Sequence, residues 1–230
     1  MKKITFLLAV TVLLVTVKTN AQDDALRECT IKYNLFKGDF QSKKYEDAYT
    51  NWIYLMDNCE DLSINIYKYG SDLVQDIRKD PVLAKRVYEQ RLKYYPNESP
   101  AKVHSDYATY LADNNLASDK EVFVILEKAY EISPQDMGVR NIYKYFQGVT
   151  DKYKDENPQR VFDTYDDVVE SVGEKLDGYA QRINELSDST RVLDSKEKRL
   201  LQAYQTNSTA LGTIEGGLDA IISEIATCDR

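Results

Sequence analysis

A four-residue spacing that ends at proline recurs along this chain and constrains its fold more than any other feature. Each full copy has a small or apolar residue, an aromatic or apolar one, another apolar one, and then proline. Two full copies and one weaker copy are present: Ala84, Tyr88, Leu92 and Pro96; Val122, Leu126, Ala129 or Tyr130, and Pro134; Ala48, Trp52, Leu55 or Met56, ending at Asn58 and Cys59. The copies begin about 36 and 38 residues apart, a period typical of stacked helix pairs. The pattern therefore predicts an all-α fold of repeated helix hairpins.

The composition also favours long helices joined by short turns. Gly (9) and Pro (5) are scarce among the 230 residues, whereas 43% are apolar and 30% are charged. That balance supplies enough apolar surface for a core and argues against general disorder. The 18 Tyr residues suit half-buried helix pairs, because the ring packs while the hydroxyl stays in water.

The first 21 residues have the pattern of a secretory signal peptide. Two lysines precede a charge-free apolar run from Ile4 to Val17, and Thr19 and Ala21 supply small residues for cleavage before Gln22. The alternative is an N-terminal membrane anchor, but the run is shorter than the roughly 20 residues that a spanning helix needs. No second long apolar run follows, so we expect a mature, exported chain without a transmembrane segment.

Removal of this segment makes the chain more acidic. Lys+Arg falls from 30 to 27 against 38 Asp+Glu, which leaves a net charge of −11. Nucleic acids and anionic lipid heads are both bound through clustered basic residues. We therefore expect no nucleic acid and no anionic membrane surface as a partner.

The three cysteines are Cys29, Cys59 and Cys228. Export permits disulfides, and Cys29 begins the first expected helix whereas Cys59 ends the second. In an antiparallel helix pair these ends lie side by side, so we hypothesise a Cys29–Cys59 bridge worth on the order of 3 kcal/mol through loop closure. The alternative is two buried thiols. Cys228 is left over, either free or paired outside this chain.

Helix starts and stops divide residues 22–170 into four expected helix pairs. A capping residue precedes proline at Asp80-Pro81, Ser99-Pro100 and Asn157-Pro158, and proline is favoured in the first helical turn. Ser118 and Glu121 have the spacing of a capping box.

Residues 171–230 show the pattern of a long helical hairpin. The last helix of the fourth pair continues with apolar steps of four and three residues, which is the seam of a coiled coil. One seam has Tyr165, Val169, Val172, Leu176, Tyr179, Ile183 and Leu186, and the other has Tyr204, Leu211, Ile214, Leu218, Ile221 and Ile225. Asp194 with Glu197 resembles a capping box after the turn. We expect an antiparallel, coiled-coil-like hairpin that caps the repeats, or one that leads into further repeats beyond this chain.

The repeats resemble the tetratricopeptide repeat (TPR) family over roughly residues 25–170. The most specific segments are 84–96 and 126–134, and Gly70 and Ala108 match the family's small residue of the first helix. The usual Trp of the first helix is missing. The resemblance implies a right-handed α-α superhelix whose concave groove binds a protein or peptide. Together with the signal peptide, the chain resembles an exported repeat protein of a Gram-negative envelope, in the periplasm or associated with the outer membrane.

In this family the first helix of each pair lines the groove. The residues beside the packing stripe on the expected first helices are Asn34, Tyr67, Ser105, Thr109, Asn141 and Lys144. The resemblance implies that these residues contact the partner. The alternative is that they form ordinary surface.

The sequence offers no pattern for catalysis or metal binding. His104 is the only histidine, which excludes His-based triads and His-rich metal sites. The acidic clusters within 151–156 and 163–167 lack the ligand order of a calcium loop, so we interpret them as solvated. We expect no metal, no cofactor and no small-molecule substrate.

Two functions follow from these patterns. The leading one is a non-catalytic scaffold that holds an envelope protein or peptide in the groove of the repeats. The alternative is a self-associating structural envelope protein that acts through the C-terminal hairpin, with Cys228 linking subunits. An enzyme would need a catalytic half beyond residue 230, because no nucleophile is paired with a base here.

Overall fold

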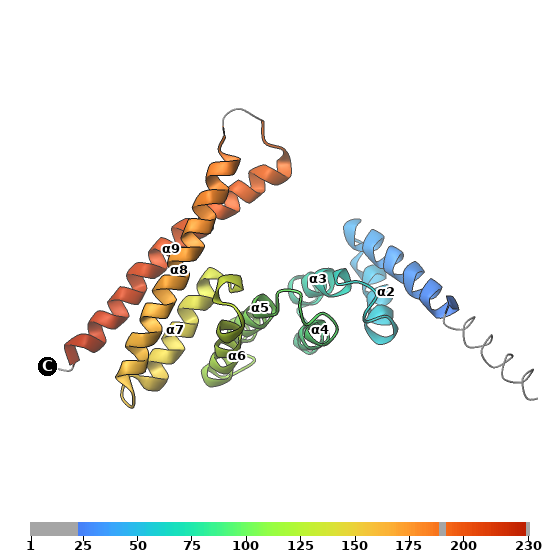
Figure 1. Cartoon of the computed structure of the whole chain (residues 1–230). Coiled ribbons are helices and arrows are strands. Elements are labelled where there is room, and N and C mark those ends of the chain that lie inside the picture. The colour runs from blue at the N-terminus through green and yellow to red at the C-terminus, as the bar shows by residue number, and fades with distance from the viewer. Residues whose placement is uncertain (1–22, 189–191, 229–230) are drawn as a thin grey trace, which may run out of the picture. The chain divides into compact units, whose positions relative to one another are not determined.

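The computed structural model describes residues 23–188 and 192–228, and every regular element in those ranges is a helix (Figure 1). The expected all-α fold is therefore confirmed for this part of the chain. The expected signal peptide, residues 1–21, lies outside the described residues. Two compact units divide the chain: the first ends at Pro96 and the second begins at Asn97.

The first unit contains two helix pairs. The helix over residues 23–41 pairs with α2 (Tyr45–Asn58), and α3 (Asn65–Asp72) pairs with α4 (Pro81–Tyr94). A π-helical turn, η1 (Leu73–Ile77), extends α3. The large side chains at the centre of this unit are Phe36, Trp52, Leu55, Met56, Ile66, Tyr67 and Leu73, all fully buried.

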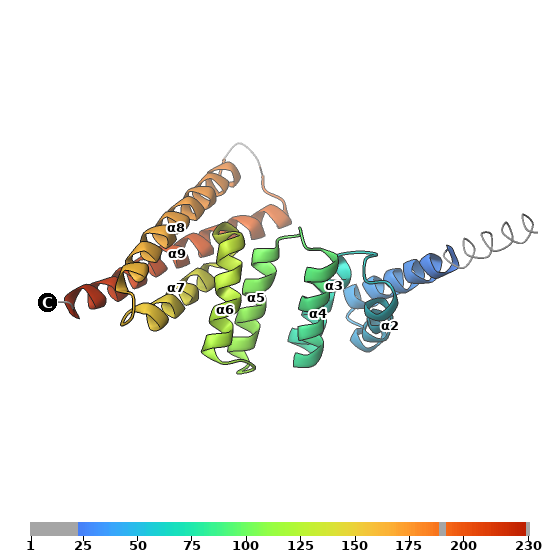
Figure 2. The same cartoon turned by 60° about the horizontal axis from the view of Figure 1, so that its bottom comes forward.

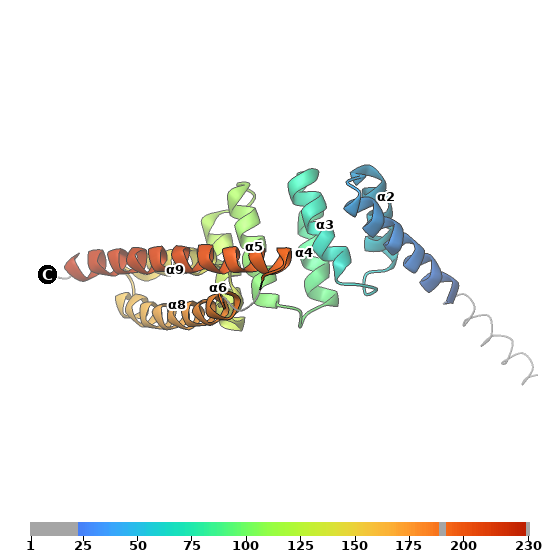
Figure 3. The same ribbon diagram turned by 90° about the horizontal axis from the view of Figure 1, so that it is seen from above.

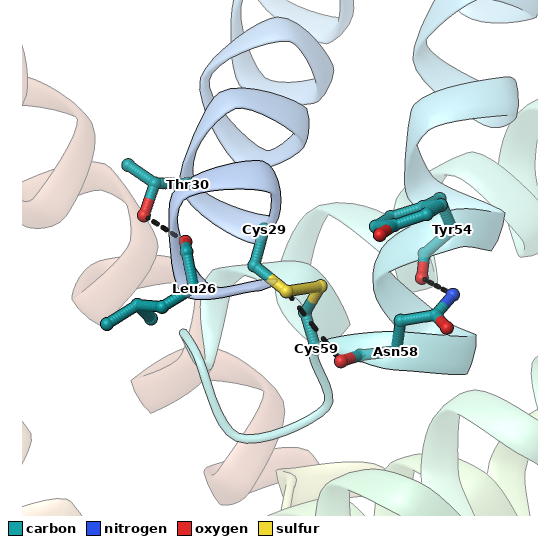
Figure 4. Close-up of a disulfide and its surroundings, with 6 residues drawn as sticks. All are labelled: Leu26, Cys29, Thr30, Tyr54, Asn58 and Cys59. Atoms are coloured by element: carbon teal, nitrogen blue, oxygen red, sulfur yellow. Dashed lines mark hydrogen bonds between the residues drawn. A yellow bond between two sulfur atoms is a disulfide. The ribbon is translucent and has the colours of Figure 1, made fainter. Parts of the chain in front are cut away.

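A disulfide joins Cys29 and Cys59, as the sequence predicts (Figure 4). The two Cα atoms lie 5.8 Å apart, and both side chains are buried. The bond ties the helix over residues 23–41 to the residue that follows α2. Next to it, the side-chain amide of Asn58 donates to the Tyr54 carbonyl oxygen at 3.0 Å and holds the last turn of α2.

The indole ring of Trp52 fixes α2 against α3. The ring is fully buried, and its N–H donates to the Ile66 carbonyl oxygen at 2.9 Å. A Cβ atom at Gly70 would lie 2.3 Å from Nε1 of Trp52. The small residue noted at this position is therefore required, because the two helices approach too closely for a side chain.

Within residues 97–188 and 192–228 the second unit has five α-helices. They are α5 (Pro100–Asp113), α6 (Asp119–Ile132), α7 (Val139–Tyr153), α8 (Pro158–Leu186) and α9 (Ser195–Cys228), with a short 3-10 turn, η2 (Pro134–Asp136), after α6. Figure 2 shows α5 and α6 as neighbours in this unit. Apolar residues of all five helices share one core.

Four of the five expected helix starts form side-chain caps. In each, a side-chain oxygen accepts a hydrogen bond from a backbone N–H of the first turn. The capping residues are Asp80, Ser118, Asn157 and Asp194. Ser99 is the exception: its φ is 54° and its side chain makes no capping bond, so proline at the first position begins α5 without it.

Helices α8 and α9 lie side by side (Figure 3). The Tyr179 and Tyr204 ring centroids are 5.6 Å apart, and the Tyr165 hydroxyl donates to the Asp219 carboxylate. Because a later position of α8 meets an earlier position of α9, the two helices run antiparallel. Helix α8 passes residue 170 without a break. The expected continuous seam from Tyr165 to Leu186 lies within this one helix, and α5 to α9 share a core.

Helix α7 is held on two sides by close contacts at glycine. A Cβ atom at Gly148 would lie 2.3 Å from the Phe123 ring of α6, and one at Gly217 of α9 would lie 3.1 Å from the Tyr143 ring. The Phe123 ring also stacks on Tyr145, with an interplanar angle of 4°. These contacts set the distance of α7 from α6 and from α9.

We predict that Gly148→Ala lowers the free energy of unfolding by about 1–2 kcal/mol. The added methyl overpacks the Phe123 contact, which outweighs the helix propensity that alanine gains. Gly178→Ala is the matched control, because Gly178 also lies in a long helix but has nothing within 4 Å of the Cβ position. It should stabilise by about 0.5–1 kcal/mol. Urea denaturation measures both, and two changes of the same sign would contradict the close approach.

We predict that losing the disulfide destabilises the first unit by roughly 3 kcal/mol, because a loop with a sequence separation of 30 is then open in the unfolded state. Hydrogen exchange of the oxidised and reduced protein, and of a Cys29→Ala/Cys59→Ala variant, should show faster exchange in residues 23–96. Peptides from 97–228 provide the internal control. Unchanged exchange near α2 would show that the bond contributes little.

Candidate functional site

The structure places the two expected contact residues of the first unit differently. Asn34 is exposed on the helix over residues 23–41. Tyr67 is fully buried, and its hydroxyl donates to the Glu60 carbonyl oxygen at 2.8 Å. Burial, with the nearby Glu60, raises the pKa of Tyr67. Its expected place on an exposed surface is therefore corrected: Tyr67 is part of the core.

Three of the four expected contact residues of the second unit, Thr109, Asn141 and Lys144, belong to a polar seam between α5 and α7. The Thr109 hydroxyl donates to the Asn141 side-chain oxygen, and Lys144 lies 3.6 Å from the Asp113 carboxylate. Arg140 donates to both oxygens of that carboxylate at 2.8 and 3.0 Å. We call this set the α5–α7 seam; it holds the first helices of successive pairs together.

Burial within this unit corrects two more of the six expectations. Ser105 has no exposed surface and Asn141 is 5% exposed, whereas Thr109 and Lys144 are partly exposed. For Asn141 the physical reason is that α7 packs beside α5, so its side chain meets Thr109 instead of solvent. Partner contact stays a prediction for Asn34, Thr109 and Lys144.

A hollow of about 580 Å³ lies at one end of the second unit. It is bounded by the end of α7, the start of α8 and the C-terminal part of α9. Its lining residues are Gln147, Thr150, Asp151, Lys154, Asp155, Pro158, Ile221, Glu224 and Ile225. On α7 and on α9 these residues recur at steps of three and four, so each helix contributes a single face.

The direction of α7 and α9 explains why their ends meet there. Tyr143 of α7 contacts Gly217 of α9, and the lining residues of both helices follow these two positions in chain order. The two helices therefore run parallel, and their last turns border the hollow together. Ile221 and Ile225 also pack against the shared core, which fixes the α9 wall.

The charges on this lining are unbalanced. Three carboxylates, from Asp151, Asp155 and Glu224, face one ammonium group, from Lys154. Among the described residues, no ion pair includes Asp151, Asp155 or Lys154. The negative charge of the hollow is thus only partly offset by the protein itself.

Thr150, on the same lining, carries a polar atom without a partner. The residue is 8% exposed, and its hydroxyl oxygen is buried with no hydrogen bond. Buried polar atoms in folded proteins are almost always bonded, so this one stands out. Its backbone carbonyl is satisfied, because it accepts from the N–H of Lys154 at 3.0 Å.

His104 and Lys175 are among the titratable groups outside the hollow whose pKa values are shifted. Burial and the nearby Lys128 lower the pKa of His104, and burial lowers the pKa of Lys175, whose ammonium donates to the Gln135 carbonyl oxygen. Neither residue lines the hollow. In the part of the chain that the structure describes, no three metal-ligating side chains gather closely enough to hold an ion.

Some of these residues could be noticed in the sequence alone. Asp151 and Asp155 stand four apart in a cluster that we interpreted as solvated, and that interpretation missed the hollow beside them. Thr150 gave no signal, since a threonine inside an amphipathic helix is common. The contact of α7 with residues about 70 positions later on α9 can be seen only in the folded structure.

For the described helices, none combines the length and apolarity that crossing a bilayer requires.

We predict that Ser105→Asp destabilises the protein by roughly 3 kcal/mol, because a carboxylate would be placed where no solvent reaches. Asn34→Asp is the control, since Asn34 is exposed on its helix and should change stability by less than about 0.5 kcal/mol. Thermal unfolding followed by circular dichroism compares the two. An unchanged melting temperature for Ser105→Asp would mean that α5 does not pack as described.

Comparison with models of known protein families, with curated proteins and with solved structures gives no match for this chain. The resemblance to tetratricopeptide repeats stays a prediction that depends on the residues of the repeats. The function has to be argued from the geometry of the two units.

Proposed function

We propose that this protein is a non-catalytic scaffold that binds a protein or peptide partner. The observation that carries the proposal is the hollow at the ends of α7, α8 and α9, which is concave, mixed in polarity and bordered by rigid helices. Concave sites with a few placed polar groups are the usual form of binding sites. Affinity would come from a few anchors in this shaped surface.

The repeat pattern supports a scaffold of the tetratricopeptide type. The pairs α5–α6 and α7–α8 follow one another, and the α5–α7 seam joins their first helices. In this proposal the helix pairs stack as a TPR-like superhelix, and α8 with α9 forms a coiled-coil-like hairpin that covers the end of the stack. Repeat proteins need such an end cap because each repeat buries its apolar face only against neighbours.

We place the protein outside the cytoplasm, in the periplasm or at the outer membrane of a Gram-negative bacterium. The signal-peptide pattern of residues 1–21 supports export. The Cys29–Cys59 bond supports an oxidising compartment, where such bonds persist.

A second candidate is self-association through the α8–α9 hairpin. Val192 is 92% exposed and Leu200 is 40% exposed, and both lie near the turn that joins the two helices. Contact with another protein surface would remove these apolar side chains from water. In this candidate the surface belongs to a second copy of the chain.

A photo-cross-linking residue placed at Gln147 in the source cells tests the scaffold. Gln147 is exposed and lines the hollow, so one dominant protein adduct is expected there. The control position is Gln181, which is exposed on α8 but away from the hollow, and it should give none of that adduct. Equal adducts at both positions, or none at Gln147, would overturn the scaffold. Adducts of the chain with itself would favour self-association, which light scattering at several concentrations then checks.

A further inference from the structure

We propose that the hollow binds a lysine or arginine side chain from a basic segment of the partner. This inference depends on the proposed scaffold function and names what the scaffold recognises. Three features carry it: the charge of the lining, its apolar wall and the unpaired hydroxyl of Thr150.

The charge of the lining selects a cation. Three carboxylates and one ammonium group leave the hollow net negative, and Asp151 and Asp155 have no ion-pair partner among the described side chains. A guanidinium or ammonium group entering there would form charge-assisted hydrogen bonds with carboxylate oxygens. An acidic segment would instead meet like charges, which is costly in a partly enclosed site.

The apolar wall selects a long cation. Ile221, Ile225 and Pro158 line the hollow beside the carboxylates. Lysine and arginine carry an apolar stem that packs on such a wall while the charged head reaches polar groups. A bare metal ion would gain nothing from this wall, and the described residues offer no cluster of three ligands for one.

The Thr150 hydroxyl supplies a further acceptor. It is buried and unpaired in the free protein. Rotation about χ1 exchanges the hydroxyl with the methyl group of threonine, and both rotamers occur in helices. A hydroxyl that turns toward the hollow would accept no proton, but its oxygen lone pairs would accept a hydrogen bond from the bound cation, so that the group finds a partner only when the ligand is present.

The test uses a fluorescent peptide of alternating arginine and serine, and a second peptide with glutamine in place of arginine. Anisotropy should show binding of the arginine peptide only. Asp151→Asn/Asp155→Asn should weaken that binding by roughly tenfold or more. The matched control is Glu170→Gln/Asp177→Asn, which removes the same charge from exposed positions of α8 outside the lining; it should weaken binding by less than about twofold.

Thr150→Val separates a binding role from a packing role. Valine has nearly the same shape but no unpaired hydroxyl, so the melting temperature should rise by a few degrees while the affinity for the arginine peptide falls. A rise in both quantities would overturn the role of Thr150.

The remaining outcomes decide between this inference and the scaffold. Equal weakening by the two double variants would overturn the inference, because the acidic surface as a whole would then attract the peptide. A protein adduct at position 147 without any binding of the arginine peptide would overturn the inference alone and leave the scaffold standing. If neither the adduct nor peptide binding is found, both fail.

Discussion

Close contact between an aromatic ring and a glycine of the following helix pair sets the packing in both units. The Trp52 ring lies on Gly70, and the Phe123 ring lies on Gly148; in each case a Cβ atom would come within 2.3 Å of the ring. A ring that packs flat on a backbone lets two helices approach more closely than two side chains allow. The buried hydrogen bond from Trp52 to Ile66 then fixes the register. The distance between α2 and α3 and the distance between α6 and α7 both depend on this spacing.

Local chemistry made much of the fold predictable. Capping at Asp80, Ser118, Asn157 and Asp194 depends on residues within one helical turn, and a single sequence shows such signals directly. The Cys29–Cys59 bond was also predictable, because it joins the two ends of neighbouring helices in one hairpin. The start at Ser99 was predictable only in part, since its φ of 54° takes the side chain out of capping geometry.

Contacts between distant helices explain what the sequence could not show. Ser105 and Asn141 have the polarity of surface residues, but both are buried in the fold, Asn141 where α7 packs beside α5 and meets Thr109. The hollow could not be predicted from the sequence for the same reason. Its acidic residues are visible on α7, but the opposite wall comes from Ile221 and Ile225, and their distance from α7 depends on the Tyr143 contact with Gly217.

The two sides of α7 contribute to stability in opposite ways. Gly148 and Thr150 are two positions apart, so they point to nearly opposite sides of the helix. The Gly148 side is closed on Phe123 and contributes to stability. The Thr150 side carries an unpaired hydroxyl beside Asp151, in a hollow with excess negative charge, and both features lower the stability of the free protein. Selection for stability alone would favour valine at position 150 and a balancing cation near Asp151. Neither the valine nor the balancing cation is present, although the other side of the same helix is tightly packed. This arrangement is expected of a binding surface on which a cationic ligand pairs with the free hydroxyl and the carboxylates.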